Sequence, residues 1–291
     1  MRKTLLATAG VLAVAGSTLT ALPAGAAVGD VPADCAAFTT AYRSDGQRLS
    51  YGYNARKTSV TAHPGDKLAW VPSAWQQWGA AGDTDLFISS ELATHPTDGY
   101  LYDLERRGER TNGVWKMTRN TSSRIASGFA GTRILANGST YLYRVAGTSL
   151  YRYKVSYTST TPTLSAPVTL RTTGWNAVKT LTFERTEGTG TAQVDVLIGT
   201  KTSGELVEWR VNVAKPSTIS STVLKSTGWA GFSSLSSGYC GSHVNGRSLL
   251  GITAAGAASV YFDANRTDRI GTDIKGGSLG SLGWTAKGYG Q

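Results

Sequence analysis

The chain has 291 residues, of which 16% are charged, and its formal net charge is +10. Its 8 Trp, 13 Tyr and 6 Phe residues provide ample apolar surface to bury, which argues against a disordered chain. The basic residues are scattered rather than gathered in a block. This distribution argues against a nucleic-acid-binding surface and is typical of a soluble protein, or of one attracted to a polyanionic surface such as a bacterial wall.

The N-terminal residues predict export. A short basic start, Met1–Lys3, precedes an apolar run from Leu5 to Ala15 and a small-residue stretch at 24–27. This order is typical of a secretory signal peptide, which we assign to residues 1–27. The apolar run is too short for a membrane-spanning helix, so a membrane anchor is the weaker alternative. We therefore expect a secreted, extracellular protein that is not inserted in a membrane.

The two cysteines, Cys35 and Cys240, are predicted to form a disulfide, since an isolated pair in an exported protein is usually oxidised. The bridge would close a loop of about 205 residues, worth roughly 4–5 kcal/mol on the chain-entropy account. Cys240 and His243 also have the spacing of two metal ligands. No further ligand type lies near them in the sequence, so we predict no metal site there.

Short strands dominate the rest of the chain. Apolar and polar residues alternate over runs of five or six residues, and turn residues bound each run. Clear examples are 49–53, 141–145, 150–155 and 206–211. Long helical patterns are hard to find after the N-terminal region. The fold class predicted is therefore all-β.

One strand type recurs, in which a glycine or small residue precedes an apolar-aromatic run. Its copies align on Leu49, Leu101, Leu150, Leu206 and Val260, with steps of 52, 49, 56 and 54 residues. Repetition at such a period indicates a repeat architecture.

A second element, a glycine followed by an aromatic residue, runs in phase with the first. It occurs at Phe129, Trp175, Trp229 and Trp284, in steps of 46, 54 and 55 residues, and we interpret 77–79 around Trp78 as a degenerate first copy. A third, apolar element at 85–88, 194–199 and 248–252 precedes the glycine-led strand.

A unit of about fifty residues with roughly four strands is the size of a propeller blade. We therefore predict a five-bladed β-propeller formed by residues 28–291 as one domain, because a single blade cannot bury both of its faces alone. A β-sandwich is the alternative, but it predicts no such internal period.

The sequence also suggests how the ring closes. We expect the N-terminal segment Ala36–Tyr42 to complete the final sheet, and the disulfide to hold the ring at this seam. Only residues 285–291 follow Trp284, which we judge too few for another strand and its turn.

Residues for catalysis are sparse. The three histidines, His63, His95 and His243, lack the partners of a metal or acid–base motif. The run around Ser278 matches a nucleophile elbow, but no Asp, Glu or His follows it. We predict no enzyme activity, no cofactor and no calcium. A secreted hydrolase stays as an alternative, because two carboxylates for sugar hydrolysis can be brought together by the fold without a sequence motif. The candidate pairs are Glu184 with Glu187 and Glu205 with Glu208.

The repeated Gly-Trp step, followed by an apolar strand and a glycine-led Leu-Tyr strand, resembles the tachylectin-type propeller lectins. The stretches 174–209 and 228–262 follow that order best, and the likeness runs through residues 40–291. The second copy has Phe129 in place of Trp, and the fourth has Val207 in place of Tyr. The resemblance implies a five-bladed fold and repeated sugar sites. Exported bacterial propellers of this kind are also similar to the lectin subunits of secreted toxin particles.

Binding of glycans on a cell or wall surface is therefore the function predicted. A Trp or Tyr ring suits the apolar C–H faces of a sugar. The candidate glycan-binding residues are Trp175, Trp229, Trp284, Phe129, Trp209 and Tyr151. Packing within and between blades is the competing interpretation for these rings. The alternative function is a protein-binding propeller, acting as a scaffold or as a subunit of a secreted complex.

Overall fold

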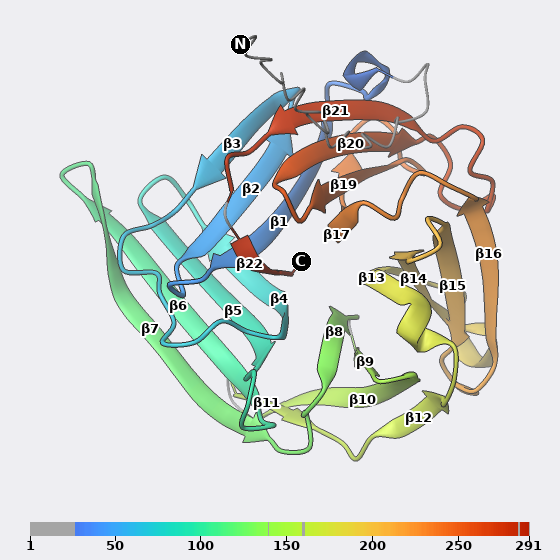
Figure 1. The fold of residues 1–291 in the computed structure, drawn as a ribbon, viewed down its shortest axis with the longest axis horizontal. Coiled ribbons are helices and arrows are strands. Elements are labelled where there is room, and N and C mark those ends of the chain that lie inside the picture. The colour runs from blue at the N-terminus through green and yellow to red at the C-terminus, as the bar shows by residue number, and fades with distance from the viewer. Residues whose placement is uncertain (1–26, 139, 159–160, 285, 291) are drawn as a thin grey trace, which may run out of the picture.

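The computed structural model describes residues 27–138, 140–158, 161–284 and 286–290, so the predicted signal peptide lies almost wholly outside the described residues. Five antiparallel sheets form a ring about a central axis, as Figure 1 shows. The strands β22, β4, β8, β13 and β17 lie nearest this axis. The prediction of a five-bladed β-propeller is confirmed.

The first two blades hold four main strands each. Blade 1 runs from the axis outward as β22 (Ala286–Tyr289), β1 (Cys35–Arg43), β2 (Arg48–Asn54) and β3 (Lys57–Thr61). Blade 2 has the longest strands: β4 (Ala74–Gly82), β5 (Leu86–Thr94), β6 (Leu101–Thr111) and β7 (Val114–Ala126). In Figure 1 the β6–β7 hairpin of blade 2 reaches beyond the rest of the ring.

The other three blades complete the ring in chain order. Blade 3 is β8 (Thr132–Asn137), β9 (Tyr141–Ala146) and β10 (Ser149–Thr158), with β11 (Thr161–Leu164) and β12 (Val168–Arg171) both paired to β10. Blade 4 is β13 (Val178–Glu187), β14 (Val194–Lys201), β15 (Leu206–Asn212) and β16 (Ile219–Lys225). Blade 5 is β17 (Phe232–Ser237), β19 (Arg247–Thr253), β20 (Ala257–Asp263) and β21 (Lys275–Ser281). The helices described are three single 3₁₀ turns: η1 (Val28–Asp30), η2 (Trp175–Ala177) and η3 (Gly190–Ala192).

The sequence repeats correspond to fixed positions in a blade. Each glycine-led strand is the third strand counted from the axis, and each glycine-aromatic step directly precedes an innermost strand. The two elements touch between neighbouring blades: the Phe129 N–H donates to the Gly99 carbonyl (2.8 Å), and the Trp229 N–H donates to the Gly204 carbonyl (3.0 Å). This contact explains why the two elements keep the same period.

These contacts define two edges of the ring. We call the edge with the glycine-aromatic turns and the turns between second and third strands the staple edge. The opposite edge, formed by the β4–β5 and β6–β7 turns and their equivalents, is called the cleft edge. Neighbouring strands in a blade are antiparallel, so successive turns alternate between the two edges.

The predicted way of closing the ring is wrong, because the closing strand comes from the C-terminal segment and not from the N-terminal one. Residues after Trp284 do form a strand, β22, and it pairs with β1 through Ala41–Tyr289 and Tyr42–Gly288. The C-terminal segment therefore supplies the innermost strand of the first blade. The N-terminal segment does not complete the final sheet; it forms β1 of blade 1, and β22 covers the inner edge of β1 from Ala41 to Arg43.

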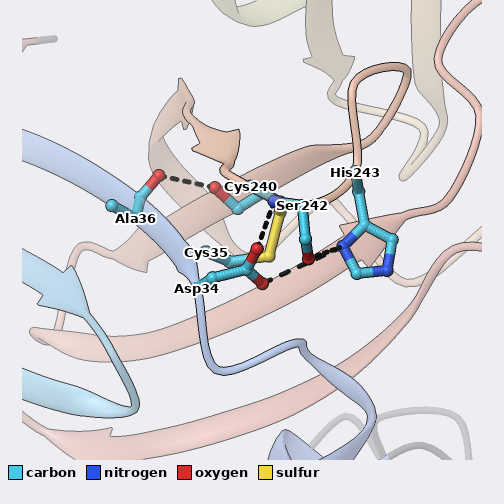
Figure 2. Close-up of a disulfide and its surroundings, with 7 residues drawn as sticks. Asp34, Cys35, Ala36, Cys240, Ser242 and His243 are labelled. Atoms are coloured by element: carbon cyan, nitrogen blue, oxygen red, sulfur yellow. Dashed lines mark hydrogen bonds and ion pairs between the residues drawn. A yellow bond between two sulfur atoms is a disulfide. The ribbon is translucent and has the colours of Figure 1, made fainter.

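The predicted disulfide between Cys35 and Cys240 is confirmed. Cys240 belongs to β18 (Tyr239–Cys240), a short strand of the blade 5 segment that pairs with the beginning of β1. Figure 2 shows Asp34 beside the bridge, directed toward Ser242 and His243. Hydrogen bonds from Ser242 hold the pKa of the Asp34 carboxyl below its usual value. The bridge thus joins the start of β1 to the blade 5 segment at the cleft edge, whereas β22 pairs with the other end of β1.

Candidate functional site

The structure places the predicted glycan-binding rings largely in the core. Five of them, Trp175, Trp229, Trp284, Phe129 and Trp209, are each no more than 6% exposed. Tyr151 is half-buried. All four glycine-aromatic rings lie at the staple edge, where their turns contact the preceding blade.

Each of these rings has an aromatic or cationic neighbour. The ring centroids of Trp175 and Trp209 are 5.3 Å apart, and those of Trp229 and Tyr261 are 4.6 Å apart. Trp284 meets the edge of Tyr51 at 6.0 Å. Such pairs are typical of packing inside and between blades. A glycan contact at these rings stays a prediction.

The packing of the remaining two candidates follows the same pattern. Phe129 stacks on Tyr153 at 5.1 Å, and the Arg144 guanidinium lies 4.7 Å from the centre of the Phe129 ring. The same guanidinium lies 5.5 Å from the centre of the Tyr151 ring. These cation–π contacts hold the Phe129 turn against blade 3 at the staple edge.

Among the described residues, a cleft opens at the cleft edge on each side of blade 2. The first, of about 460 Å³, lies between blades 1 and 2. Its blade 1 wall carries Phe38, whose side chain is 56% exposed, and its blade 2 wall carries Phe87. His63 stacks on Phe87, with ring centroids 4.5 Å apart. Clefts of this size are common binding sites for small molecules.

Two glycines inside strands make room for these rings. A Cβ at Gly52 would lie 3.0 Å from the Phe38 ring, and a Cβ at Gly108 would lie 2.1 Å from the Phe87 ring. Glycine within a strand weakens it and is found where another group approaches closely. The sequence thus accommodates an aromatic ring on each wall of the cleft at some cost to strand stability.

Polar groups line the cleft between its aromatic walls. Hydroxyl groups of the blade 1 wall come from Thr40, Ser50, Ser59 and Thr61. Blade 2 contributes the Gln77 amide and the hydroxyl of Ser89, which is buried and has no hydrogen-bond partner among the described residues. A ligand bearing several hydroxyl groups would find both donors and acceptors here.

A closed ionic network lies beneath this cleft as its floor, and Arg48 is the member of the network that lines the cleft. Arg48 donates to Glu91 (2.5 Å), and Arg106 contacts both Glu91 (3.0 Å) and Asp66 (2.7 Å). The Tyr42 hydroxyl donates to the same Glu91 carboxylate at 2.8 Å. Two arginines are therefore balanced by two carboxylates.

The electrostatics of this floor favour a neutral cleft. Burial alone would raise the pKa of Glu91, but Arg106 and Arg48 outweigh it and hold the pKa below its usual value. Glu91 therefore stays ionised and keeps both arginines paired. Burial also lowers the pKa of His63, so this side chain is uncharged at neutral pH. The first cleft thus carries no net charge.

The second cleft, of about 430 Å³, lies between blades 2 and 3. Tyr157 from β10 is 48% exposed and stacks on Trp78 from β4, with centroids 4.6 Å apart and planes 15° apart. The rim carries two ion pairs, Arg119 with Glu105 and Arg107 with Glu109. This cleft also combines an aromatic face with polar side chains.

Asp103 lies beneath the second cleft and is only 4% exposed. Burial, together with the negative charge of Glu105, raises the pKa of Asp103 to about 6. The site therefore holds a carboxyl group that ionises close to neutral pH.

Trp78 corrects one sequence interpretation. It lies inside β4, at the irregularity between Gln77 and Gly79, and not before an innermost strand. It is therefore not a degenerate copy of the glycine-aromatic step. Its ring lies on the blade 3 side of the sheet, where it stacks on Tyr157.

The axis of the ring leaves little room for a ligand. The cavity beside the innermost strands measures about 40 Å³, which suits a few water molecules and not a sugar ring. Its wall includes Arg133, which donates to the Trp175 carbonyl (2.8 Å), and Lys179, which donates to the Ala230 carbonyl (2.5 Å). Both cations thus tie neighbouring blades together.

The four carboxylates weighed for hydrolysis are engaged in ion pairs. Glu184 contacts Arg247 between blades 4 and 5, and Glu187 contacts Arg185 and Arg210 within blade 4. Glu205 pairs with Lys201 at 3.1 Å, and Glu208 faces Arg210 at 3.5 Å.

Within the described part of the chain, no group of three or more His, Cys, Asp or Glu residues is placed to hold a metal ion. The described residues also include no helix long and apolar enough to cross a membrane.

The cleft residues were not predicted from the sequence. Phe38 and Tyr157 occur once each, outside the repeated elements, so the period that identified the blades does not mark them. The only available signal is an aromatic residue placed opposite a glycine, as Phe38 is opposite Gly52.

Comparison with known proteins gives likeness of fold only. No protein-family model matches the sequence, and no curated protein matches it. Among solved structures, a six-bladed fungal lectin, the Aleuria aurantia lectin described for its fucose recognition mode, aligns with 85% of this chain and 76% of its own (TM-score 0.41, 11% identity). A mercury derivative of the fucose-specific lectin from Aleuria aurantia covers 86% and 80% (TM-score 0.40, 10% identity). A putative 6-phosphogluconolactonase from Bacteroides fragilis covers 84% and 94% (TM-score 0.36, 9% identity). No function is transferred from these likenesses.

Proposed function

We propose that this chain is a secreted, lectin-like propeller that binds a carbohydrate in the first cleft, between blades 1 and 2. The observation that carries the proposal is the exposed ring of Phe38, which faces Phe87 and His63 across a cleft lined with hydroxyl and amide groups. A sugar presents apolar C–H faces to such rings and hydroxyl groups to such polar side chains.

The charge of the cleft points to an uncharged ligand. Its arginines are balanced by Glu91 and Asp66, and no unpaired charge lines its walls. A charged ligand would lose its hydration without gaining an opposite charge. A neutral sugar loses less hydration free energy, and its hydroxyl groups form hydrogen bonds in the cleft in place of those to water. Neutral glycans of a cell or wall surface are therefore the ligands we propose.

A glycan array with purified protein tests this function, and Phe38→Ala identifies the site. Loss of the ring should weaken binding by at least about tenfold, the range of a central contact residue. The melting temperature should change little, because the Phe38 side chain is 56% exposed.

Tyr239→Ala is the matched control, since this aromatic side chain is 61% exposed and does not line either cleft. It should bind glycans as the unchanged protein does. Equal binding by all three proteins would remove the first cleft as the site. A blank array, with a specific protein recovered in a pull-down, would favour the subunit or scaffold function instead.

A further inference from the structure

Exposed aromatic side chains are few and unevenly placed. Among the described residues, three aromatic side chains are exposed: Phe38, Tyr157 and Tyr239. Phe38 lies in the first cleft and Tyr157 lies in the second. The ring therefore offers two open aromatic faces, one on each side of blade 2.

Both clefts open at the same edge of the ring. Phe38 lies near the start of β1, a second strand, and Tyr157 lies near the end of β10, a third strand. In every blade the second strand starts, and the third strand ends, at the cleft edge. Ile88 is 38% exposed and borders both clefts: it alternates along β5 with Phe87 and Ser89 of the first cleft, and it lies opposite Arg107 of the second.

The charges of the second cleft are paired as well. Arg119 contacts Glu105, and Arg107 contacts Glu109, so its rim also presents no unpaired charge. The two clefts thus share an aromatic ring, hydrogen-bonding groups and paired charges along their rims.

We propose that the two clefts are subsites of one extended site, which crosses the end of blade 2 and binds a linear, uncharged oligosaccharide. This inference rests on the proposed function and specifies its ligand as a glycan chain and not a single terminal sugar. One sugar unit stacks on Phe38, the chain crosses the cleft-edge end of blade 2, and a later unit stacks on Tyr157. Once the first unit is bound, the second contact is intramolecular and adds affinity without a second loss of translational freedom.

Titration calorimetry with three probe series tests this inference. The probes are cello-, laminari- and chito-oligosaccharides of one to six sugar units, each titrated into the unchanged protein, Phe38→Ala, Tyr157→Ala and Tyr239→Ala. In at least one series, affinity should rise by about tenfold or more with chain length, as linked subsites require. Tyr157→Ala should bind the monosaccharide normally and lose this gain. Phe38→Ala should lose binding at every length, and Tyr239→Ala should match the unchanged protein.

The outcomes separate this inference from the proposed function. Affinity that does not change with length, or a full gain in Tyr157→Ala, overturns the extended site but leaves monosaccharide binding at Phe38 intact. Absence of binding by every probe, together with a blank glycan array, overturns both. Melting curves of all variants confirm that a lost signal does not come from unfolding.

Discussion

Aromatic residues serve two separate roles in this chain, and their burial distinguishes them. Trp229 is 4% exposed and packs against Phe232 and Tyr261, whereas Phe38 is 56% exposed and lines a cleft. Removing a buried ring leaves a cavity as well as losing transfer free energy, whereas removing an exposed one does neither.

Trp229→Ala should therefore lower the free energy of unfolding by about 3–5 kcal/mol. Chemical denaturation measures this value, and Tyr239→Ala is the exposed control that should stay near the unchanged protein. If Trp229→Ala instead kept its stability and lost glycan binding, the ring would be a binding platform, as the sequence predicted. Trp175 and Trp284, with 5% and 6% exposure, are expected to behave as Trp229 does.

The raised pKa of Asp103 predicts that the stability of the fold falls as the pH rises. Its pKa is raised from 3.8 to about 6, so the folded protein binds a proton more tightly than the unfolded chain does. The stability from this group is fully present below about pH 4 and is lost as the pH rises through about 6.

Asp103→Asn should remove the loss of stability that accompanies ionisation of this carboxyl group. Relative to the unchanged protein, it should gain stability between pH 4 and pH 7, by up to about 3 kcal/mol for a shift of about two pKa units. Unfolding free energies of both proteins across this range give the difference. Parallel curves for the two proteins would show that Asp103 does not titrate in this way.

At the scale of the strands, β1 is the element on which ring closure depends. Its inner edge pairs with β18 at Cys35 and Ala36, and with β22 from Ala41 to Arg43. The first contact is covalent and the second is held by hydrogen bonds. An unpaired strand edge at this position would expose backbone groups beside the axis.

Replacing both Cys35 and Cys240 by serine should therefore cost roughly 4–5 kcal/mol of stability, the value expected for a loop of this length. Thermal and denaturant unfolding measure the cost, and non-reducing peptide mapping confirms the bridge in the unchanged protein. Unaltered stability of the double variant would mean that β22 closes the ring without help from the bridge.

The repeats made the fold predictable from sequence, because each repeated element has one structural task. Leu49, Leu101 and their equivalents begin or lie in the third strands, and Phe129, Trp175 and Trp229 lie in turns that touch the preceding blade. The closing strand was missed because β22 has only four residues and follows Trp284 almost at once. A strand this short relies on β1 for its pairing and has no alternating pattern of its own.

The clefts escaped prediction for a different reason. Repeated residues are those that every blade needs for packing, whereas Phe38, Tyr157 and Trp78 each stand outside the repeated elements. The sugar sites predicted from the repeats are therefore aromatic rings that the structure places in the core. The sequence does not reveal that Arg48, Glu91 and Arg106 neutralise one another, because this network joins three strands of two blades.

At the scale of the whole molecule, the ring separates stability from binding. Among the described residues, its staple edge holds the glycine-aromatic turns, the cavity at the axis measures about 40 Å³, and the two larger clefts lie at the cleft edge around blade 2. Blade 2 also has the longest strands, with 11 residues in β6 and 13 in β7. We therefore expect a single asymmetric binding region and not five equivalent sites.

The crystal structure of the protein with the strongest array ligand tests the central claim most directly. The account predicts one sugar unit stacked on Phe38 between blades 1 and 2, with hydrogen bonds to the polar side chains of that cleft. A sugar bound instead at the staple edge, against Trp175, Trp229 or Trp284, would contradict it.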